Sequence, residues 1–79
     1  MSNRKTYDQI YITIFSIGQN DLGEELKYNS IPAWDSIGHM SLIAELEEEF
    51  DVMLEMDDII DFGSYTIGID ILKKYDVEI

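Results

Sequence analysis

The clearest helix of the chain is predicted for residues 36–50, which read SIGHMSLIAELEEEF. The segment has no proline, one glycine near its start and a run of residues with high helix propensity. When successive residues are placed about 100° apart, one side of this helix carries the large apolar side chains of Leu42, Ile43, Leu46 and Phe50. We therefore expect this side to face the core.

The opposite side of the same helix combines small apolar groups with carboxylates. It carries Ile37, Ser41, Ala44 and Glu48, flanked by Met40 and Glu47. A lone exposed apolar residue is common on protein surfaces, and these residues could also pack against the loop or the next helix. Three apolar residues beside acids favour a protein-binding surface, in which apolar contact provides area and carboxylates steer a basic partner.

Upstream of this helix, apolar residues recur at spacings of three and four from Thr6 to about Ile17. They are Tyr7, Ile10, Tyr11, Ile14 and Ile17. This pattern predicts a first helix over residues 6–17, with Thr6 or Asp8 near its start. The β-branched run at residues 12–14 would also suit a strand.

A long loop is expected between the first helix and residue 34. Glycine, asparagine, serine and proline punctuate residues 18–34 too densely for a long regular element. Its apolar side chains could hold it against the core; they are Leu22, Leu26, Tyr28 and Ile31. Loops of this length are uncommon in small domains and are often functional. This loop leads directly to Ser36.

Two further helices are expected after residue 50. A short helical turn over residues 56–62 is broken by Gly63, and a last helix runs from Ser64 or Thr66 to Tyr75 with a hydroxyl cap at its start. The sequence thus predicts an all-α fold. We expect a four-helix bundle with a short third helix and a long loop between the first two helices.

Length and composition restrict the class of protein. The 79 residues leave room for one domain, residues 1–79, and a hydrophobic content of 46% is too high for a disordered chain. The absence of cysteine excludes a disulfide scaffold, a thiol nucleophile and a thiolate metal site. No apolar signal segment follows the amino terminus, and the apolar stretches are too short to span a bilayer. We expect a cytoplasmic protein.

The charge of the chain points to protein partners. Five Lys and Arg residues against seventeen Asp and Glu residues give a net charge of −12. Such a charge repels nucleic acids and anionic membranes and attracts basic protein surfaces. We therefore expect partners that are proteins with basic patches, without nucleic-acid binding or membrane insertion. We also expect a monomer.

Ser36 begins the central helix directly after the long loop. A serine in this place is usually an N-cap, although Asp35 could cap the helix instead. A phosphodiester on Ser36 would also be favoured, because it would lie at the positive end of the helix dipole. Catalysis by Ser36 with His39 as base is a third possibility, but no Gly-x-Ser-x-Gly turn surrounds the serine. We expect His39 to be a hydrogen-bonded residue at the edge of the core.

A cluster of acids occupies the short third helix. Asp57, Asp58 and Asp61 lack the alternating spacing, central glycine and terminal glutamate of a calcium loop. The sequence therefore predicts no metal site here. We expect these carboxylates to charge the amino end and the outer face of the short helix.

The residues around Ser36 carry a family likeness. Residues 34–37, Trp-Asp-Ser-Ile, followed by residues 42–50, LIAELEEEF, resemble an acyl carrier protein. The likeness continues through residues 57–62 and 67–75, so it covers the chain from about Ile31 onward. An isolated Asp-Ser-Ile would be a weak signal. At the start of an acidic helix in a chain of this length it is a specific one.

The resemblance implies a cofactor and a set of partners. In that family the serine at the position of Ser36 receives 4′-phosphopantetheine from coenzyme A, and an acyl or aminoacyl group is held as a thioester on the thiol of this arm. The implied partners are a phosphopantetheinyl transferase, a loading ligase, and acyltransferase or synthase enzymes. The resemblance also implies that the carrier has no catalytic activity of its own.

The resemblance further implies a right-handed four-helix bundle whose interior, between the second and third helices, can shelter some acyl chains. It places Asp35, Ile37, Glu47 and Glu48 in contact with partner enzymes. Together with the helix analysis, the predicted partner surface comprises Asp35, Ile37, Met40, Ser41, Ala44, Glu47 and Glu48.

Three residues depart from the pattern of fatty-acid carriers: Trp34, Gly38 and Ser41. Those carriers usually have a small residue before the Asp-Ser pair and acids two and five residues after the serine. A glycine after Asp-Ser-Ile, here Gly38, is similar to the pattern in D-alanyl carriers of cell-wall modification. The run Trp-Asp-Ser-x-Gly-His-Met resembles the same region of specialised stand-alone carriers. We expect a discrete carrier of polysaccharide, cell-wall or secondary metabolism. A D-alanyl carrier, a fatty-acid carrier and an unmodified acidic adaptor protein are the alternatives.

Overall fold

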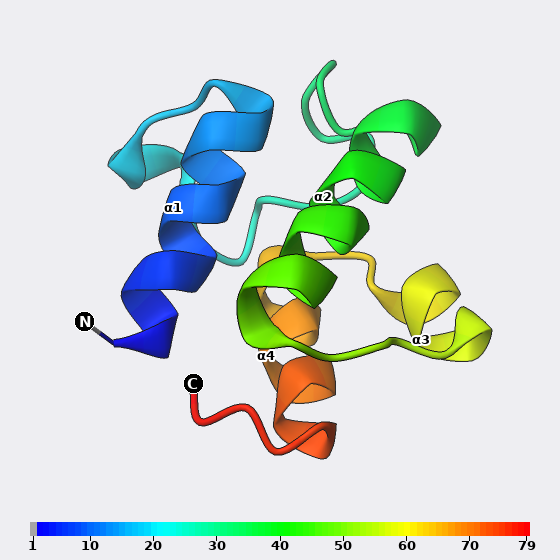
Figure 1. The fold of residues 1–79 in the computed structure, drawn as a ribbon. Coiled ribbons are helices and arrows are strands. Elements are labelled where there is room, and N and C mark those ends of the chain that lie inside the picture. Colours follow the sequence, from blue (N-terminus) through cyan, green and yellow to red (C-terminus); the bar gives the residue numbers. More distant parts are fainter. Residues whose placement is uncertain (1) are drawn as a thin grey trace.

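Four α-helices and one short 3₁₀ helix make up the computed structural model, which describes residues 2–79 (Figure 1). They are α1 (Asn3–Phe15), η1 (Gln19–Asp21), α2 (Ser36–Phe50), α3 (Met56–Asp61) and α4 (Tyr65–Lys74). Within residues 2–79 the only β-type pairing is an isolated bridge between Lys27 and Ser64. The predicted all-α fold, with a short third helix and a long loop between the first two helices, is confirmed.

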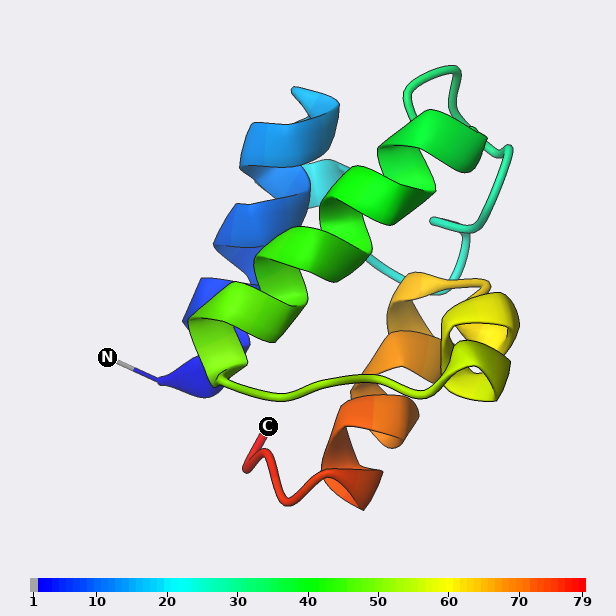
Figure 2. The ribbon, with the colours of Figure 1, turned by 45° about the vertical axis from the view of Figure 1, so that its right-hand side comes forward.

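The four helices form two neighbouring pairs. α1 and α2 lie side by side, and α3 lies next to α4 on the side away from α1 (Figures 1 and 2). Within the part of the chain that the structure describes, no helix is both long enough and apolar enough to cross a membrane.

The first helix begins earlier than the sequence predicts. Its N-cap is Ser2, whose hydroxyl accepts a hydrogen bond from the Lys5 N–H at 3.2 Å, so neither Thr6 nor Asp8 caps it. The helix ends at Phe15, because Ser16 adopts the left-handed conformation with φ of 54°. Ile17 therefore lies beyond the helix, and the prediction of residues 6–17 is wrong at both ends.

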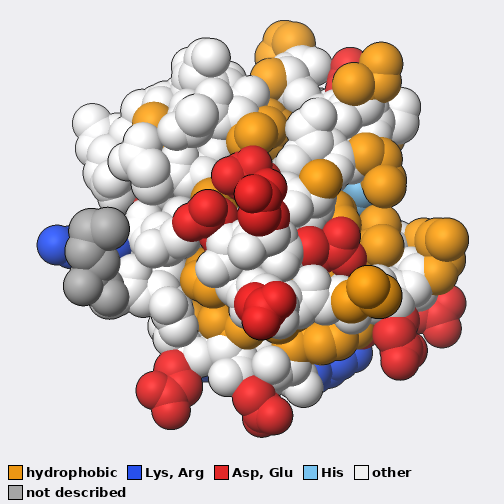
Figure 3. All heavy atoms as spheres, in the orientation of Figure 1, with side chains coloured by type: hydrophobic (Ala, Val, Ile, Leu, Met, Phe, Trp, Pro, Cys, Tyr) orange, Lys and Arg blue, Asp and Glu red, His pale blue; other side chains and the backbone are white. Residues whose placement is uncertain are grey.

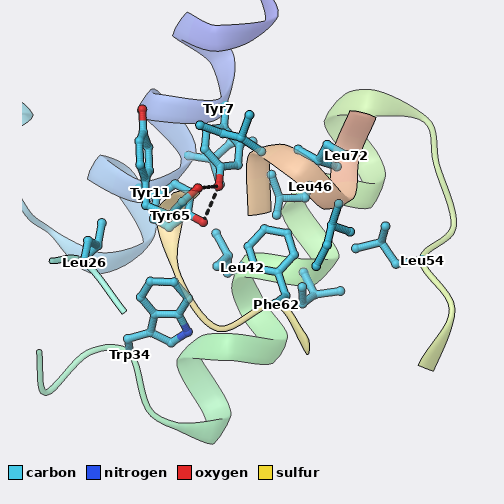
Figure 4. Close-up of a cluster of buried hydrophobic side chains, with 14 of the residues drawn as sticks. Tyr7, Tyr11, Leu26, Trp34, Leu42, Leu46, Leu54, Phe62, Tyr65 and Leu72 are labelled. Atoms are coloured by element: carbon cyan, nitrogen blue, oxygen red, sulfur yellow. Dashed lines mark hydrogen bonds between the residues drawn. The ribbon is translucent and has the colours of Figure 1, made fainter. Parts of the chain in front are cut away.

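The core is built around tyrosines from α1 (Figure 4). The Tyr7 hydroxyl donates to the Tyr65 carbonyl at 2.6 Å, so it accepts from the Tyr11 hydroxyl, 2.8 Å away. α4 approaches this cluster closely because it has a glycine there. A Cβ on Gly68 would lie 2.4 Å from the Tyr7 hydroxyl oxygen and 2.3 Å from Cζ of Phe62. Tyr7 and Tyr11 are therefore both packed and hydrogen-bonded.

The predicted core face of α2 is largely confirmed. Leu42, Ile43 and Leu46 are buried, and Phe50 is half-buried against the core. Among the loop residues expected to pack inward, Leu26 is buried and Leu22 and Ile31 are half-buried. Tyr28 is exposed, so that part of the prediction is wrong.

The long loop is tied to the junction of α3 and α4. The Tyr65 N–H donates to the Leu26 carbonyl at 2.9 Å, and the Tyr28 N–H donates to the Gly63 carbonyl at 2.9 Å. At the same junction, the Ser64 hydroxyl accepts from the Ile67 N–H at 3.1 Å, which confirms the predicted cap of the last helix. These bonds fix the segment that leads to Ser36.

Asp58 does not lie on the outer face of α3, as the sequence analysis expected. It is buried, and it is the one buried residue of that helix. Its carboxylate accepts hydrogen bonds from Lys74 Nζ at 2.6 Å and from the Tyr75 hydroxyl. These bonds lower the pKa of Asp58, with the one from Lys74 as the larger cause. The carboxylate therefore fastens α3 to the end of α4.

Candidate functional site

The head of α2 is capped by Asp35 and not by Ser36. The Asp35 Oδ1 accepts a hydrogen bond from the Gly38 N–H at 2.8 Å, which satisfies one free N–H of the first turn. Ser36 is the first helical residue and is exposed. The hydroxyls of Ser2 and Ser64 each accept a hydrogen bond from a backbone N–H of the helix that they cap. Within residues 2–79 the Ser36 hydroxyl accepts no such bond, because Asp35 caps α2. The hydroxyl of Ser36 is thus available for modification.

Two hydrogen bonds hold His39 in the turn that follows Ser36. The indole Nε1–H of Trp34 donates to His39 Nδ1 at 2.9 Å, and His39 Nε2 lies 2.8 Å from the Ile59 carbonyl oxygen. An indole N–H can only donate and a carbonyl can only accept, so the imidazole is neutral with its proton on Nε2. His39 therefore links the loop, α2 and α3, and the prediction of a hydrogen-bonded histidine is confirmed.

This arrangement bears on the catalytic interpretation of Ser36 and His39. A general base needs a free lone pair directed at the hydroxyl that it deprotonates. The one lone pair on the His39 ring nitrogens accepts the Trp34 N–H, and the other nitrogen donates to α3. The geometry gives His39 a structural task and leaves Ser36 without a base from this residue.

Gly38 and Trp34 have a packing role that the sequence alone did not reveal. A Cβ on Gly38 would lie 1.9 Å from the Ala33 carbonyl oxygen, so the loop touches the helix backbone at this point. Trp34 is fully buried, and its ring stacks on Phe15 with a centroid distance of 5.2 Å. Gly38 therefore lets the end of the loop contact the first turn of α2, and Trp34 packs the same end of the loop against α1.

The structure brings most of the predicted partner surface together. Ile37 is 78% exposed and Met40 55%, and the neighbouring exposed residues are Ser41, Ala44 and Glu48. Asp35 is exposed at the same end, where its carboxylate caps the helix.

Glu47 is placed differently from the rest of this surface. It is half-buried, and its Oε2 accepts a hydrogen bond from the Leu54 N–H at 2.9 Å. Its carboxylate therefore holds the connection between α2 and α3.

Sequence analysis missed the contribution of α3 to this apolar surface. Met56 and Ile60 are each 70% exposed. Hydrophobic side chains gather on the right-hand side in Figure 3, over the start of α2 and over α3. A six-residue helix is too short for its apolar periodicity to show which side faces solvent.

Neither the arrangement of possible metal ligands nor comparison with known proteins assigns a function to this site. Within residues 2–79 no group of three or more His, Asp or Glu side chains is arranged to hold a metal ion. No protein-family model matches the chain, and searches of curated proteins and of solved structures also find no match. The resemblance to acyl carrier proteins therefore depends on the sequence motifs alone.

Proposed function

We propose that this protein is an acyl carrier that holds its cargo as a thioester on a 4′-phosphopantetheine arm attached to Ser36. One observation carries the proposal: an exposed serine is the first residue of a 15-residue helix whose cap is provided by its neighbour, Asp35. Because Asp35 does the capping, attaching the arm to the Ser36 oxygen removes no cap from the helix.

The residues around Ser36 suit a phosphodiester. The positive end of the α2 dipole and the unpaired N–H groups of its first turn favour a negatively charged group there. Trp34, Gly38 and His39 fix the position of this turn against the loop and α3. When bound, the arm supplies the thiol that carries the cargo. The chain itself provides a rigid base and an accessible attachment point.

Recognition by partner enzymes is assigned to the exposed side of α2. Ile37 and Met40 offer apolar contact next to Ser36, while Ser41 and Ala44 let another surface approach closely. Glu48 and the net charge of −12 favour enzymes with basic patches: a phosphopantetheinyl transferase, a loading ligase and an acyltransferase or synthase. We place the carrier in a specialised pathway of polysaccharide, cell-wall or secondary metabolism, from the run of residues 34–40.

The test is direct modification. The protein is incubated with coenzyme A and a broad-specificity phosphopantetheinyl transferase, and its intact mass is measured. We expect one added 4′-phosphopantetheine on the wild type and on Ser41→Ala, an exposed serine of the same helix, and none on Ser36→Ala. An unmodified wild type, or an arm still present on Ser36→Ala, would refute the proposal. The mass of the cargo on native holo protein then separates D-alanyl, fatty-acid and other carriers.

A second candidate function is an unmodified acidic adaptor. The observation that favours it is the exposure of Ile37 and Met40, which could bind a protein without any arm. The two functions differ in their need for Ser36. If the protein is an adaptor, its Ser36→Ala variant binds and activates the partner as well as the wild type does. If it is a carrier, it supports turnover of a partner enzyme only in the holo form.

A further inference from the structure

A groove of about 580 Å³ lies between α1 and α2, toward the end of α2 that is far from Ser36. α1 contributes residues between Lys5 and Ile14, and α2 contributes Glu45 and Glu49. This volume falls within the range of about 300–1,000 Å³ that is usual for binding sites. The groove is separate from the proposed carrier site and does not depend on the arm.

The α1 side of the groove can be buried under an apolar surface with little loss of hydrogen bonding. Ile10 is buried and Ile14 half-buried, and they give the groove an apolar floor. Three of the polar side chains on this wall already take part in hydrogen bonds, since Gln9 Nε2 donates to Thr13 Oγ1 at 3.2 Å and the Thr6 hydroxyl donates to the Ser2 carbonyl at 3.4 Å. The remaining polar group is the Lys5 ammonium at the end of the groove. An apolar surface laid on this wall therefore leaves few polar atoms without hydrogen bonds.

The α2 side of the groove is acidic and favours a positively charged ligand. Glu45 and Glu49 are one helical turn apart, so they line the groove together. Neither carboxylate forms an ion pair within residues 2–79, where the one salt bridge joins Lys74 to Asp58. Figure 3 shows acidic side chains over the second half of α2. A ligand with an apolar body and cations on one side would match both walls.

The length of the groove indicates the form of this ligand. Nine residue steps separate Lys5 from Ile14, which is about 14 Å along a helix at 1.5 Å per residue. We propose that the groove binds an amphipathic α-helix of a partner protein, about nine or ten residues long. Its aliphatic residues lie over Ile10 and Ile14, and its Lys or Arg residues face Glu45 and Glu49.

The experiment uses a synthetic peptide as a probe of this class. A twelve-residue helix carries leucines at spacings of three and four on one side and lysines along one edge of that side. It is titrated into ¹⁵N-labelled protein, and amide chemical shifts report both the affinity and the location of binding. A peptide of the same composition in scrambled order and a peptide with glutamate in place of lysine serve as controls.

Three variants connect the measurement to the groove. Glu45→Gln with Glu49→Gln removes the charged wall and should weaken binding by roughly three- to tenfold. Thr13→Arg fills the groove from an exposed position and should abolish binding with the fold intact by circular dichroism. The matched control is Glu24→Gln with Glu25→Gln, which removes two exposed acids in the loop. We expect this control to change the affinity less than twofold.

The proposal is supported if the shifts centre on residues 5–14 and 45–49 and if the variants behave as stated. Absence of binding at millimolar peptide overturns it, and so do shifts centred on α3 or equal weakening by the loop control, which would indicate non-specific charge attraction. Concentration-dependent shifts in the groove without peptide would assign the groove to a second copy of the chain and would also overturn it.

Discussion

The bridge from Trp34 through His39 to α3 should be among the most sensitive points of the fold, and His39→Ala tests it. The substitution removes two hydrogen bonds and leaves the indole N–H of a fully buried tryptophan without an acceptor. An unsatisfied buried donor costs about 1–3 kcal/mol, and the lost bond to the Ile59 carbonyl about 0.5–1.5 kcal/mol. The expected loss is therefore about 2–4 kcal/mol. A 79-residue domain has a total stability of only about 4–12 kcal/mol.

A double-mutant cycle with Trp34→Phe isolates the bond itself. Trp34→Phe removes the donor, so His39→Ala should cost less in that background, by about 1–2 kcal/mol. Urea unfolding followed by far-UV circular dichroism measures all four proteins, because Trp34 is the only tryptophan and its fluorescence is lost in half of them. His39→Asn, whose amide oxygen can lie near the position of Nδ1, should recover part of the loss.

Two results would refute this reasoning. A cost below about 0.5 kcal/mol for His39→Ala would mean that the bridge contributes no more than an ordinary surface contact. Additive effects of the two substitutions would mean that Trp34 and His39 act independently, despite the 2.9 Å between their nitrogens.

Three further predictions concern other parts of the fold. Gly38→Ala should destabilise the protein by about 1–3 kcal/mol in urea unfolding although alanine is the better helix former, whereas Ser41→Ala on the exposed side of α2 should be nearly neutral. The pKa of Asp58 is lowered in the folded state, so its contribution is present above its ordinary value of 3.8 and is lost as the pH falls through the lower, folded value. Lys74→Met, which removes the larger cause of that shift, should therefore make the decline of stability below about pH 4 shallower. Tyr7→Phe should cost about 1–3 kcal/mol, measured by the same unfolding, because it removes the donor to α4 and the acceptor of a buried hydroxyl.

The fold was predictable where a helix has both a marked apolar side and strong end signals. α2 meets both conditions, and its predicted bounds of 36–50 agree with the structure. α1 meets only the first. Its opening turn, residues 3–5, is polar and exposed, so apolar periodicity could not find it, and the cap at Ser2 was the only signal of its true start.

The candidate site was predictable only in its local features. The exposure of Ile37 and Met40 follows from the geometry of one helix, and the hydrogen-bonded state of His39 follows from its place at the edge of the core. The partners of a buried polar group come from distant parts of the chain and need the tertiary fold. For this reason Asp58, held by side chains 16 and 17 residues away, was wrongly placed on the outer face of α3.

The geometry separates two groups of residues around Ser36 that the sequence presents as one run. The packing of the loop on α2 requires Trp34, Gly38 and His39. Ile37 and Met40 are exposed and have no role in that packing. In the proposed carrier, selection among partner enzymes would therefore act on the exposed pair and the acids beside it.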